Sequence, residues 1–374
     1  MLKKVLFVVT EDWFFVSHFQ PMARAITRLG FDVVVVARPS PAARKIADLG
    51  YRLVPNEIGR SAISPTGVAR SILALRRIIA EEQPDVVHAV ALPPVVVAAL
   101  ATLGNNIKVV LAPTGLGHLW LSHSATAIAA KKAVQFLIWT IAKRRSVVFV
   151  FENDEDPVEF GLDPADTSKI TLVGGAGVSA IEFLPTVPPS TPPMRVAIVA
   201  RMTTAKGIAP AVEAVRRLRE SGRDIRLDLF GDPDPSSGAS ISEGALRQWS
   251  AMEGIVWHGH IDAPSAVWAK SHVAVLLSWR EGLPRSLVEA MACGRPIVAT
   301  DVAGCRTLVT DGVEGFLVPV DSVEHTESAL ARLYDDVELR IKMGLAARSR
   351  FESQFTDAAV ELSITGLYQR LSRR

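Results

Sequence analysis

The feature that most constrains the fold is a strand–helix alternation that occurs twice, once on each side of a proline-rich stretch. That stretch, LPTVPPSTPP at residues 184–193, holds five prolines and has neither helical nor strand periodicity. On both sides of it, continuous runs of Val, Ile and Leu alternate with segments of helical spacing. Buried apolar strands joined by helical crossovers form parallel sheets covered on both faces. We therefore predict two doubly wound α/β domains with a linker at 184–193.

The expected elements follow from these patterns. In the first half we expect strands at 3–9, 31–37, 84–88 and 108–113 and helices at 19–29, 66–82 and 93–103. In the second half we expect strands at 194–200, 225–231, 272–278 and 295–300 and helices at 208–221, 286–293 and 323–333. Ligands of such sheets bind at the carboxyl ends of the strands. Two such domains predict a cleft between them.

Length and composition indicate a globular chain long enough for two domains, and the cysteine content indicates a reducing compartment. The 374 residues suffice for two cores, and 49% of them are apolar against 21% charged. The two cysteines cannot build a disulfide framework. The apolar run near the N-terminus, Val5 to Val9, is too short for a signal peptide, and no stretch approaches 18 consecutive apolar residues. We expect a cytoplasmic protein, with a peripheral position on the inner face of the plasma membrane as an open possibility.

The net charge of +2 is unevenly distributed. Residues 1–148 carry a net charge of +10, so the remainder carries −8. A basic half favours contact with an anionic lipid surface, a phosphorylated substrate or nucleic acid. The alternative is that the charges are scattered over a solvated surface and indicate no such partner. Charge alone leaves these alternatives open.

The most informative segment is SWREGLPRSLVEAMACGRPIVATDVAG, residues 278–304. An expected strand ends there, a turn rich in Gly and Pro follows, and a helix begins near Arg285. The free N–H groups and positive dipole end of such a helix bind phosphate. Glu281 precedes the turn and Glu289 lies about two helical turns beyond it, so one can meet a sugar while the other reaches a ribose.

Residues 281–294, EGLPRSLVEAMACG, resemble the E-G-[FL]-P-x4-E-A-M-A-x-G motif of family 4 retaining GT-B glycosyltransferases. Residues 296–304, PIVATDVAG, resemble the motif that follows it. Upstream, Arg201 to Gly207 (RMTTAKG) resembles the family's [GA]-R-x4-K-G. An Arg fork and a mobile Lys suit a nucleoside diphosphate. Further family-like markers are LFGDPD at 229–234, WHGHID at 257–262 and DGVEG at 311–315.

The resemblance implies a GT-B fold, that is, two Rossmann-like domains whose parallel sheets face each other across a cleft. It also implies roles for particular residues. Arg201 and Lys206 are expected to hold the diphosphate, Glu289 the ribose hydroxyls and Glu281 the transferred sugar. The expected donor-binding set is Gly282, Leu283, Pro284, Ser286, Leu287, Glu289, Gly259 and Gly231.

The N-terminal half is expected to bind the acceptor. Residues 10–18, TEDWFFVSH, follow the first expected strand, where the family has an acceptor loop. The longer sequence EDWFFVSHFQP resembles the subset of the family that makes capsule, O-antigen and other polyprenyl-diphosphate-linked glycans. His18 is expected to contact acceptor or donor phosphate, with Ser17 beside it; a structural cap is the alternative. Many relatives have a His after the strand at 108–113. Here Thr114 and Gly115 occupy that place, so Thr114 or His118 takes that role.

Residues 119–146 mix Trp, Phe and Leu with five basic residues. A basic amphipathic helix can lie on anionic lipid, and a lipid-linked acceptor would explain both this helix and the positive first half. An ordinary helix packed on the sheet is the alternative.

Several patterns do not carry a function. Residues 175–180, GAGVSA, match a dinucleotide fingerprint, but a proline-rich stretch follows in place of a helix. The acidic clusters 154–156 and Asp232/Asp234 are interpreted as turns, because GT-B enzymes use cationic side chains in place of a metal. No zinc spacing or P-loop occurs.

These observations lead to one committed prediction. The chain is expected to be a retaining, metal-independent glycosyltransferase without a cofactor. It is expected to move a hexosyl or N-acetylhexosaminyl group from an NDP-sugar, taken as a UDP-sugar. The expected acceptor is a glycan or a polyprenyl-diphosphate-linked sugar in cell-surface polysaccharide synthesis. No nucleic-acid partner is expected. The alternatives are a non-catalytic GT-B scaffold and a GT-B nucleotide-sugar epimerase. The predicted domains are 1–183 for the acceptor, 184–193 as linker, 194–350 for the nucleotide-sugar, and 351–374 as a helix crossing back to the first domain.

Overall fold

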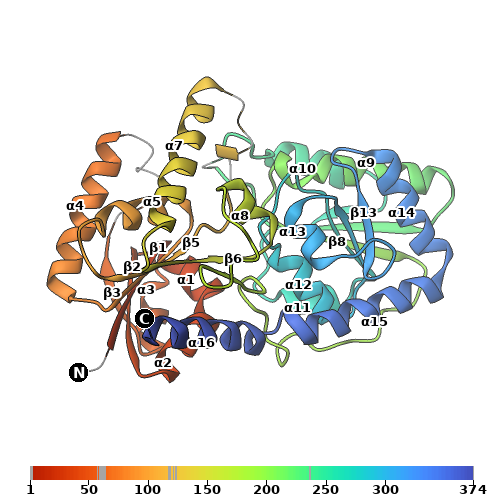
Figure 1. The fold of residues 1–374 in the computed structure, drawn as a ribbon. Coiled ribbons are helices and arrows are strands. Elements are labelled where there is room, and N and C mark those ends of the chain that lie inside the picture. Colours follow the sequence, from red (N-terminus) through yellow and green to blue (C-terminus); the bar gives the residue numbers. More distant parts are fainter. Residues whose placement is uncertain are drawn as a thin grey trace. The chain divides into compact units, whose positions relative to one another are not determined.

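The computed structural model describes residues 3–56, 58, 65–116, 119–120, 122, 124–235 and 237–373 (Figure 1). It divides into two compact units. Unit 1 comprises residues 1–177 and 357–374, and unit 2 comprises residues 178–356. The chain thus passes from one unit to the other at Gly177–Val178 and returns at Thr356–Asp357, whereas the predicted boundaries lay at 183 and 351.

Unit 1 is built on a seven-stranded sheet in the order β3-β2-β1-β4-β5-β6-β7, in which every neighbouring pair is parallel. Its strands are β1 (Lys3–Glu11), β2 (Phe31–Arg38), β3 (Arg52–Pro55), β4 (Val86–Val90), β5 (Lys108–Ala112), β6 (Val147–Phe151) and β7 (Ile170–Leu172). Its described helices are α1 (Asp12–His18), α2 (Gln20–Arg28), α3 (Ala43–Asp48), α4 (Pro65–Glu82), α5 (Leu92–Ala101), α7 (Ala125–Ala142), α8 (Glu155–Glu159) and α16 (Asp357–Arg373).

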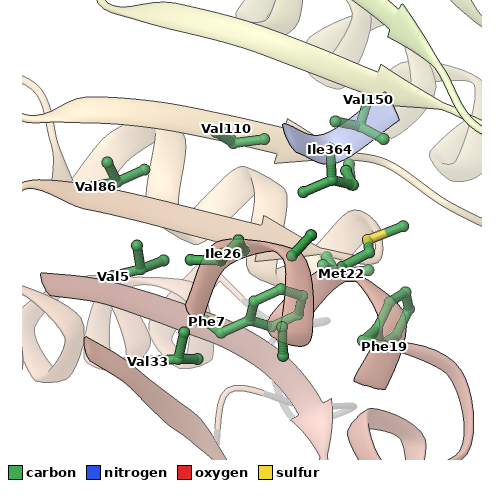
Figure 2. Packing of buried hydrophobic residues seen from close by; sticks show 14 of the residues in the cluster. Val5, Phe7, Phe19, Met22, Ile26, Val33, Val86, Val110, Val150 and Ile364 are labelled. Carbon is green, nitrogen blue, oxygen red and sulfur yellow. The ribbon is translucent and has the colours of Figure 1, made fainter. Parts of the chain in front are cut away.

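Both faces of this sheet are buried. In β1, Val5 and Phe7 point into one apolar cluster, while Leu6 and Val8 point into the cluster on the opposite face. Figure 2 shows the first cluster, to which Phe7 of β1, Phe19, Met22 and Ile26 of the α1–α2 region and Ile364 of α16 all contribute. Alternate residues of a strand face opposite sides, so a sheet covered on both faces requires uninterrupted apolar strands.

The last helix, α16, packs against α2 of unit 1 (Figure 1). Arg24 of α2 pairs with Asp357 at 3.2 Å and with Glu361 at 2.8 Å. Tyr368 of α16 lies 3.0 Å from Nδ1 of the buried His88 in β4, and burial lowers the pKa of this imidazole to about 3. The C-terminal residues therefore form part of the core of unit 1.

Unit 2 is built on a six-stranded parallel sheet in the order β10-β9-β8-β11-β12-β13. Its strands are β8 (Met194–Val199), β9 (Ile225–Phe230), β10 (Ile255–Trp257), β11 (Val273–Leu276), β12 (Ile297–Thr300) and β13 (Gly315–Val318). Its described helices are α9 (Ile208–Glu220), α10 (Glu243–Ser250), α11 (Pro264–Ala269), α12 (Arg285–Ala292), α13 (Ala303–Leu308), α14 (Val323–Asp335) and α15 (Val337–Gln354). The prediction of two Rossmann-like parallel-sheet domains is confirmed, and the cleft stays a prediction.

The proline-rich stretch at 184–193 is bound to unit 2. The fully buried Arg295 donates to the carbonyl oxygen of Thr186 at 2.9 Å, and Nε2 of His272 lies 2.9 Å from the carbonyl oxygen of Pro189. Arg348 of α15 donates to the carbonyl oxygen of Phe183 at 3.0 Å. These contacts make the stretch part of unit 2 rather than a free tether.

Two predictions about local structure were wrong. Residues 12–18 form helix α1 instead of an acceptor loop, because the buried Asp12 and Phe15 lie on one helical face and Asp12 also accepts hydrogen bonds from Ser40. The expected helix over 119–146 is shorter: α7 begins at Ala125, where the Ser124 hydroxyl accepts from the N–H of Ala127 and caps the helix.

Candidate functional site

The candidate site of unit 2 lies where the strand order reverses. The chain runs from β8 outward to β9 and β10, then returns to place β11 on the other side of β8. Ligands of doubly wound sheets bind at such a switch point, outside the carboxyl ends of the strands. The segment with Arg201 and Lys206 follows β8, and the segment with Glu281 follows β11. The two motifs therefore flank the switch point.

Lys206 and Glu281 meet directly, although 75 residues separate them. The Lys206 ammonium lies 2.5 Å from Oε1 of Glu281, and both side chains are largely buried. The backbones hold this arrangement, because the N–H of Trp279 donates to the carbonyl oxygen of Ala205 at 3.0 Å. Withdrawing such a charge pair from water costs free energy, which the attraction between the two charges offsets only where their geometry is good and further hydrogen bonds form.

Gly207 permits the close approach of these segments. Its φ of +66 lies in the left-handed region, and a Cβ there would collide with the backbone of Leu277. Gly207 also stands between the 3-10 turn Thr204–Lys206 and the start of α9. Glycine is therefore required both by conformation and by space.

Glu289 lies in α12, which begins at Arg285 directly after the turn. Its side chain is buried, and Nε of Arg285 donates to Oε1 at 2.8 Å. Burial raises the pKa of the Glu289 carboxyl, and the neighbouring Arg285 charge opposes that shift. A buried carboxylate with one cationic partner retains acceptor capacity for further hydroxyl donors.

Three of the predicted donor-binding residues serve the fold in ways that limit their role. Pro284 stands at the N-cap of α12 and, as a proline, has no backbone N–H to offer a phosphate. Leu287 is buried in the apolar core of unit 2, and its N–H donates to the carbonyl oxygen of Pro284 at 3.0 Å. Leu283 packs against the same core. Gly282 and Ser286 are half-buried at the turn and the first helical turn.

Two residues of the predicted donor-binding set, Gly231 and Gly259, are adjacent in space. The N–H of Gly231 donates to the carbonyl oxygen of Gly259 at 2.7 Å, and the indole N–H of Trp257 donates to the carbonyl oxygen of Gly231 at 2.9 Å. Gly231 has φ +133 and no space for a Cβ beside Ala200. The turns after β9 and β10 are therefore joined at the carboxyl edge of the sheet.

Arg201 carries a partner that the sequence did not indicate. Its guanidinium lies 2.5 Å from Oδ2 of Asp234, a residue predicted only as part of a turn. The Arg201 side chain is 66% exposed, whereas that of Asp234 is 12% exposed. No local pattern links two residues that are 33 positions apart, so spacing alone could not reveal this pair.

In unit 1, Ser17 and His18 form the end of α1, and the Ser17 hydroxyl lies 2.7 Å from Nδ1 of His18. Thr114 follows β5; its hydroxyl oxygen is buried and has no hydrogen-bond partner among the described residues. Gly115 is exposed, with φ +62. His118 lies outside the described residues. The Thr114 hydroxyl is thus the predicted acceptor-region atom with unused bonding capacity.

Ala91 is a feature of unit 1 that the sequence did not indicate. It stands between β4 and α5 with φ 74 and ψ 154, a conformation that residues with a Cβ seldom adopt. Its N–H donates to the carbonyl oxygen of Ala112 at 2.9 Å. β4 neighbours β1 at the switch point of this sheet, and backbone strain of this kind concentrates at ligand sites.

Within the described part of the chain, no group of three or more His, Cys, Asp or Glu side chains is arranged to hold a metal ion. None of the described helices is both long and apolar enough to cross a membrane.

Comparisons with known proteins agree with this geometry. Residues 193–336 match the family model described as glycosyl transferases group 1, and residues 4–144 match the one described as glycosyl transferase 4-like. The two models together match more than half of the chain, and it belongs to these GT-B glycosyltransferases. The predicted family, fold and enzyme class are confirmed.

Individual relatives are distant but span the chain. An N,N'-diacetylbacillosaminyl-diphospho-undecaprenol alpha-1,3-N-acetylgalactosaminyltransferase of Campylobacter jejuni is 21% identical over 95% of this chain and 96% of its own length. The putative glycosyltransferase EpsD of Bacillus subtilis is 23% identical over 98% of this chain and 97% of its own. The structure of HepE of Anabaena in complex with UDP and glucose superposes with a TM-score of 0.75 at 15% sequence identity. The match covers 98% of this chain and 99% of the HepE chain, and it shows that the two proteins share a fold.

Proposed function

We propose that this glycosyltransferase moves a hexosyl or N-acetylhexosaminyl group from a UDP-sugar to a glycan or polyprenyl-diphosphate-linked acceptor in cell-surface polysaccharide synthesis. The observation that carries the proposal is the meeting of Lys206 with Glu281, from the segments that follow β8 and β11 at the switch point of unit 2. The Campylobacter relative, which by its name acts on a diphospho-undecaprenol-linked sugar, supports this acceptor class. The HepE complex supports UDP as the nucleotide.

Charge assigns the roles in the donor site. Arg201 and Lys206 are the cations that oppose the diphosphate, together with first-turn amides of α12. Glu289 accepts hydrogen bonds from the ribose hydroxyls. Glu281, fixed by Lys206, orients the sugar and favours positive charge at its anomeric carbon. Because these cations supply the positive charge, we propose that the reaction needs neither a metal nor another cofactor.

We propose that transfer retains the anomeric configuration. The acceptor hydroxyl oxygen bonds to the anomeric carbon from the face on which the diphosphate leaves, and the carbon–oxygen bond to the β-phosphate breaks. The proton of the acceptor hydroxyl passes to a phosphate oxygen of the departing UDP. Unit 1 supplies the acceptor groups, for which Ser17, His18 and Thr114 are the described candidates and His118 a further one.

The test is transfer from UDP-N-acetylglucosamine, UDP-N-acetylgalactosamine, UDP-glucose and UDP-galactose to a short-chain polyprenyl-diphosphate sugar, with and without EDTA. We expect an α-linked product, identified by NMR, at a rate that EDTA leaves unchanged. Nucleotide binding without transfer to any acceptor would favour the scaffold alternative. Conversion of a UDP-sugar into its epimer without an acceptor would favour the epimerase.

We also propose a peripheral position on an anionic membrane, through the exposed face of α7. Phe136 is 67% exposed and Trp139 is 45% exposed, with their ring centroids 6.2 Å apart. The Lys143 ammonium lies 3.3 Å from the centroid of the Trp139 ring, and Lys132 is also exposed. Paired exposed aromatic rings bordered by lysines match the requirements of a lipid headgroup region.

Replacing Phe136 and Trp139 by Ser should lower the affinity for vesicles that contain anionic lipid by at least about tenfold, because two apolar side chains would no longer enter the interface. Vesicle co-sedimentation measures this affinity. Leu362→Ser, which alters an apolar residue of α16 that is even more exposed, is the control and should change nothing. Equal binding of the double variant, or binding that ignores lipid charge, would refute the α7 assignment.

A further inference from the structure

The ion pair between Arg201 and Asp234 joins a residue proposed to hold the donor's diphosphate to a carboxylate with no part in that proposal. One guanidinium nitrogen of Arg201 lies 2.5 Å from Oδ2 of Asp234. A guanidinium that already donates to a carboxylate offers fewer N–H groups to phosphate oxygens. The donor must therefore compete with Asp234 for this cation.

Asp234 is held in position by the backbone. Its loop lies along the segment that carries Arg201: the N–H of Met202 donates to the carbonyl oxygen of Asp232 at 2.9 Å, and the N–H of Thr204 donates to that of Ala239 at 2.9 Å. The N–H of Ile241 returns a bond of 2.9 Å to Met202. These bonds fix the backbone on either side of Asp234 and so hold its carboxylate within reach of Arg201.

The two partners differ in freedom to move. Asp234 is nearly buried, whereas Arg201 is two-thirds exposed on a long side chain. When a diphosphate arrives, Arg201 is the partner that can reorient. By contrast, the side chains of Lys206 and Glu281 are both largely buried.

From this geometry we propose that Asp234 is the counter-ion that Arg201 exchanges for the donor's diphosphate. The inference rests on the proposed donor site and adds a residue to it. Asp234 holds Arg201 before the donor binds and takes Arg201 back as the nucleoside diphosphate leaves. Its effect is to weaken the binding of UDP and so to favour release of the product.

The test is calorimetric titration of UDP and of uridine into the wild type and Asp234→Asn. The amide keeps the size of the side chain but removes its charge. We expect UDP to bind about 2- to 5-fold more tightly to the variant, the range that corresponds to an exposed ion pair. Uridine, which has no phosphate, should bind both proteins equally.

Asp262→Asn is the matched control for net charge, because the Asp262 side chain is fully exposed and pairs only with His260 among the described residues, at 3.5 Å. It should leave UDP affinity unchanged. Equal tightening by both variants would show a general charge effect and overturn the proposal. Weaker or unchanged UDP binding by Asp234→Asn, or an equal change for uridine, would also overturn it.

Arg201→Ala separates this inference from the donor site itself. If the donor site is correct, Arg201→Ala weakens UDP binding, and in that background Asp234→Asn should no longer tighten it. Persistent tightening without Arg201 would contradict the exchange while leaving the donor site intact. If Arg201→Ala leaves UDP affinity unchanged, the diphosphate assignment of Arg201 fails and the exchange fails with it.

Discussion

Lys206→Ala should lower kcat/KM for glycosyl transfer by about 10²- to 10³-fold, the usual effect of removing one preorganised charge that stabilises a transition state. The change removes a cation proposed to oppose the developing negative charge of the leaving diphosphate. It also leaves the largely buried Glu281 without the ammonium that lies 2.5 Å from it. Both consequences act in the same direction, because a largely buried Glu281 without its partner would adopt another orientation.

The measurement is the initial rate of transfer over a range of UDP-sugar concentrations, with thermal unfolding to show that the variant remains folded. Lys270→Ala, which removes an exposed lysine of the same unit, is the control and should keep the wild-type rate. A Lys206→Ala enzyme within about threefold of the wild type would contradict the role given to this pair.

Gly304→Val should cost about 1–3 kcal/mol of stability and weaken UDP binding, because the site has no space for a side chain. A Cβ at Gly304 would lie 2.8 Å from the carbonyl oxygen of Glu281 and closer still to that of Gly282. Because these are backbone atoms, a side chain at position 304 would force the turn that carries Glu281 to move. The N–H of Gly304 also donates to the carbonyl oxygen of Glu281 at 3.2 Å, a bond that such a movement would break.

Denaturant unfolding and UDP titration measure the two effects of Gly304→Val. Gly244→Ala is the control, because a Cβ in α10 meets nothing closer than the Ser242 hydroxyl at 3.9 Å and alanine favours a helix. The control should match or slightly exceed the wild type in stability. A Gly304→Val protein with wild-type UDP affinity would mean that the turn is not part of the donor site.

The fold could be predicted from the sequence because its strands are continuous and apolar. Val5 to Val9 and Val33 to Val36 are buried on both faces, and such runs have few alternatives to a covered parallel sheet. Helix α1 could not be predicted in this way. Its sequence DWFFVSH combines residues of low helix propensity, and its burial depends on contacts with the rest of unit 1.

Part of the candidate site was also visible in the sequence. Glu281, Arg201 and Lys206 stand in contiguous motifs, so their nearness at one sheet edge follows from the topology. Asp234 could not be predicted as a partner, because only the tertiary structure brings it to Arg201. Leu287 was assigned to the donor, although its spacing from Met291 is that of a buried helix face, and the structure places its side chain in the core.

The central claim is that unit 2 binds a uridine diphosphate sugar with Glu289 on the ribose. The most direct measurement is calorimetric titration of UDP, GDP and ADP into the purified protein and into Glu289→Ala. Loss of a charge-assisted ribose contact should cost about 1.5–3 kcal/mol, which is roughly 10- to 150-fold in affinity. We predict selective binding of UDP that weakens by this amount in the variant. Absence of nucleotide binding, or equal binding by the wild type and Glu289→Ala, would contradict the account.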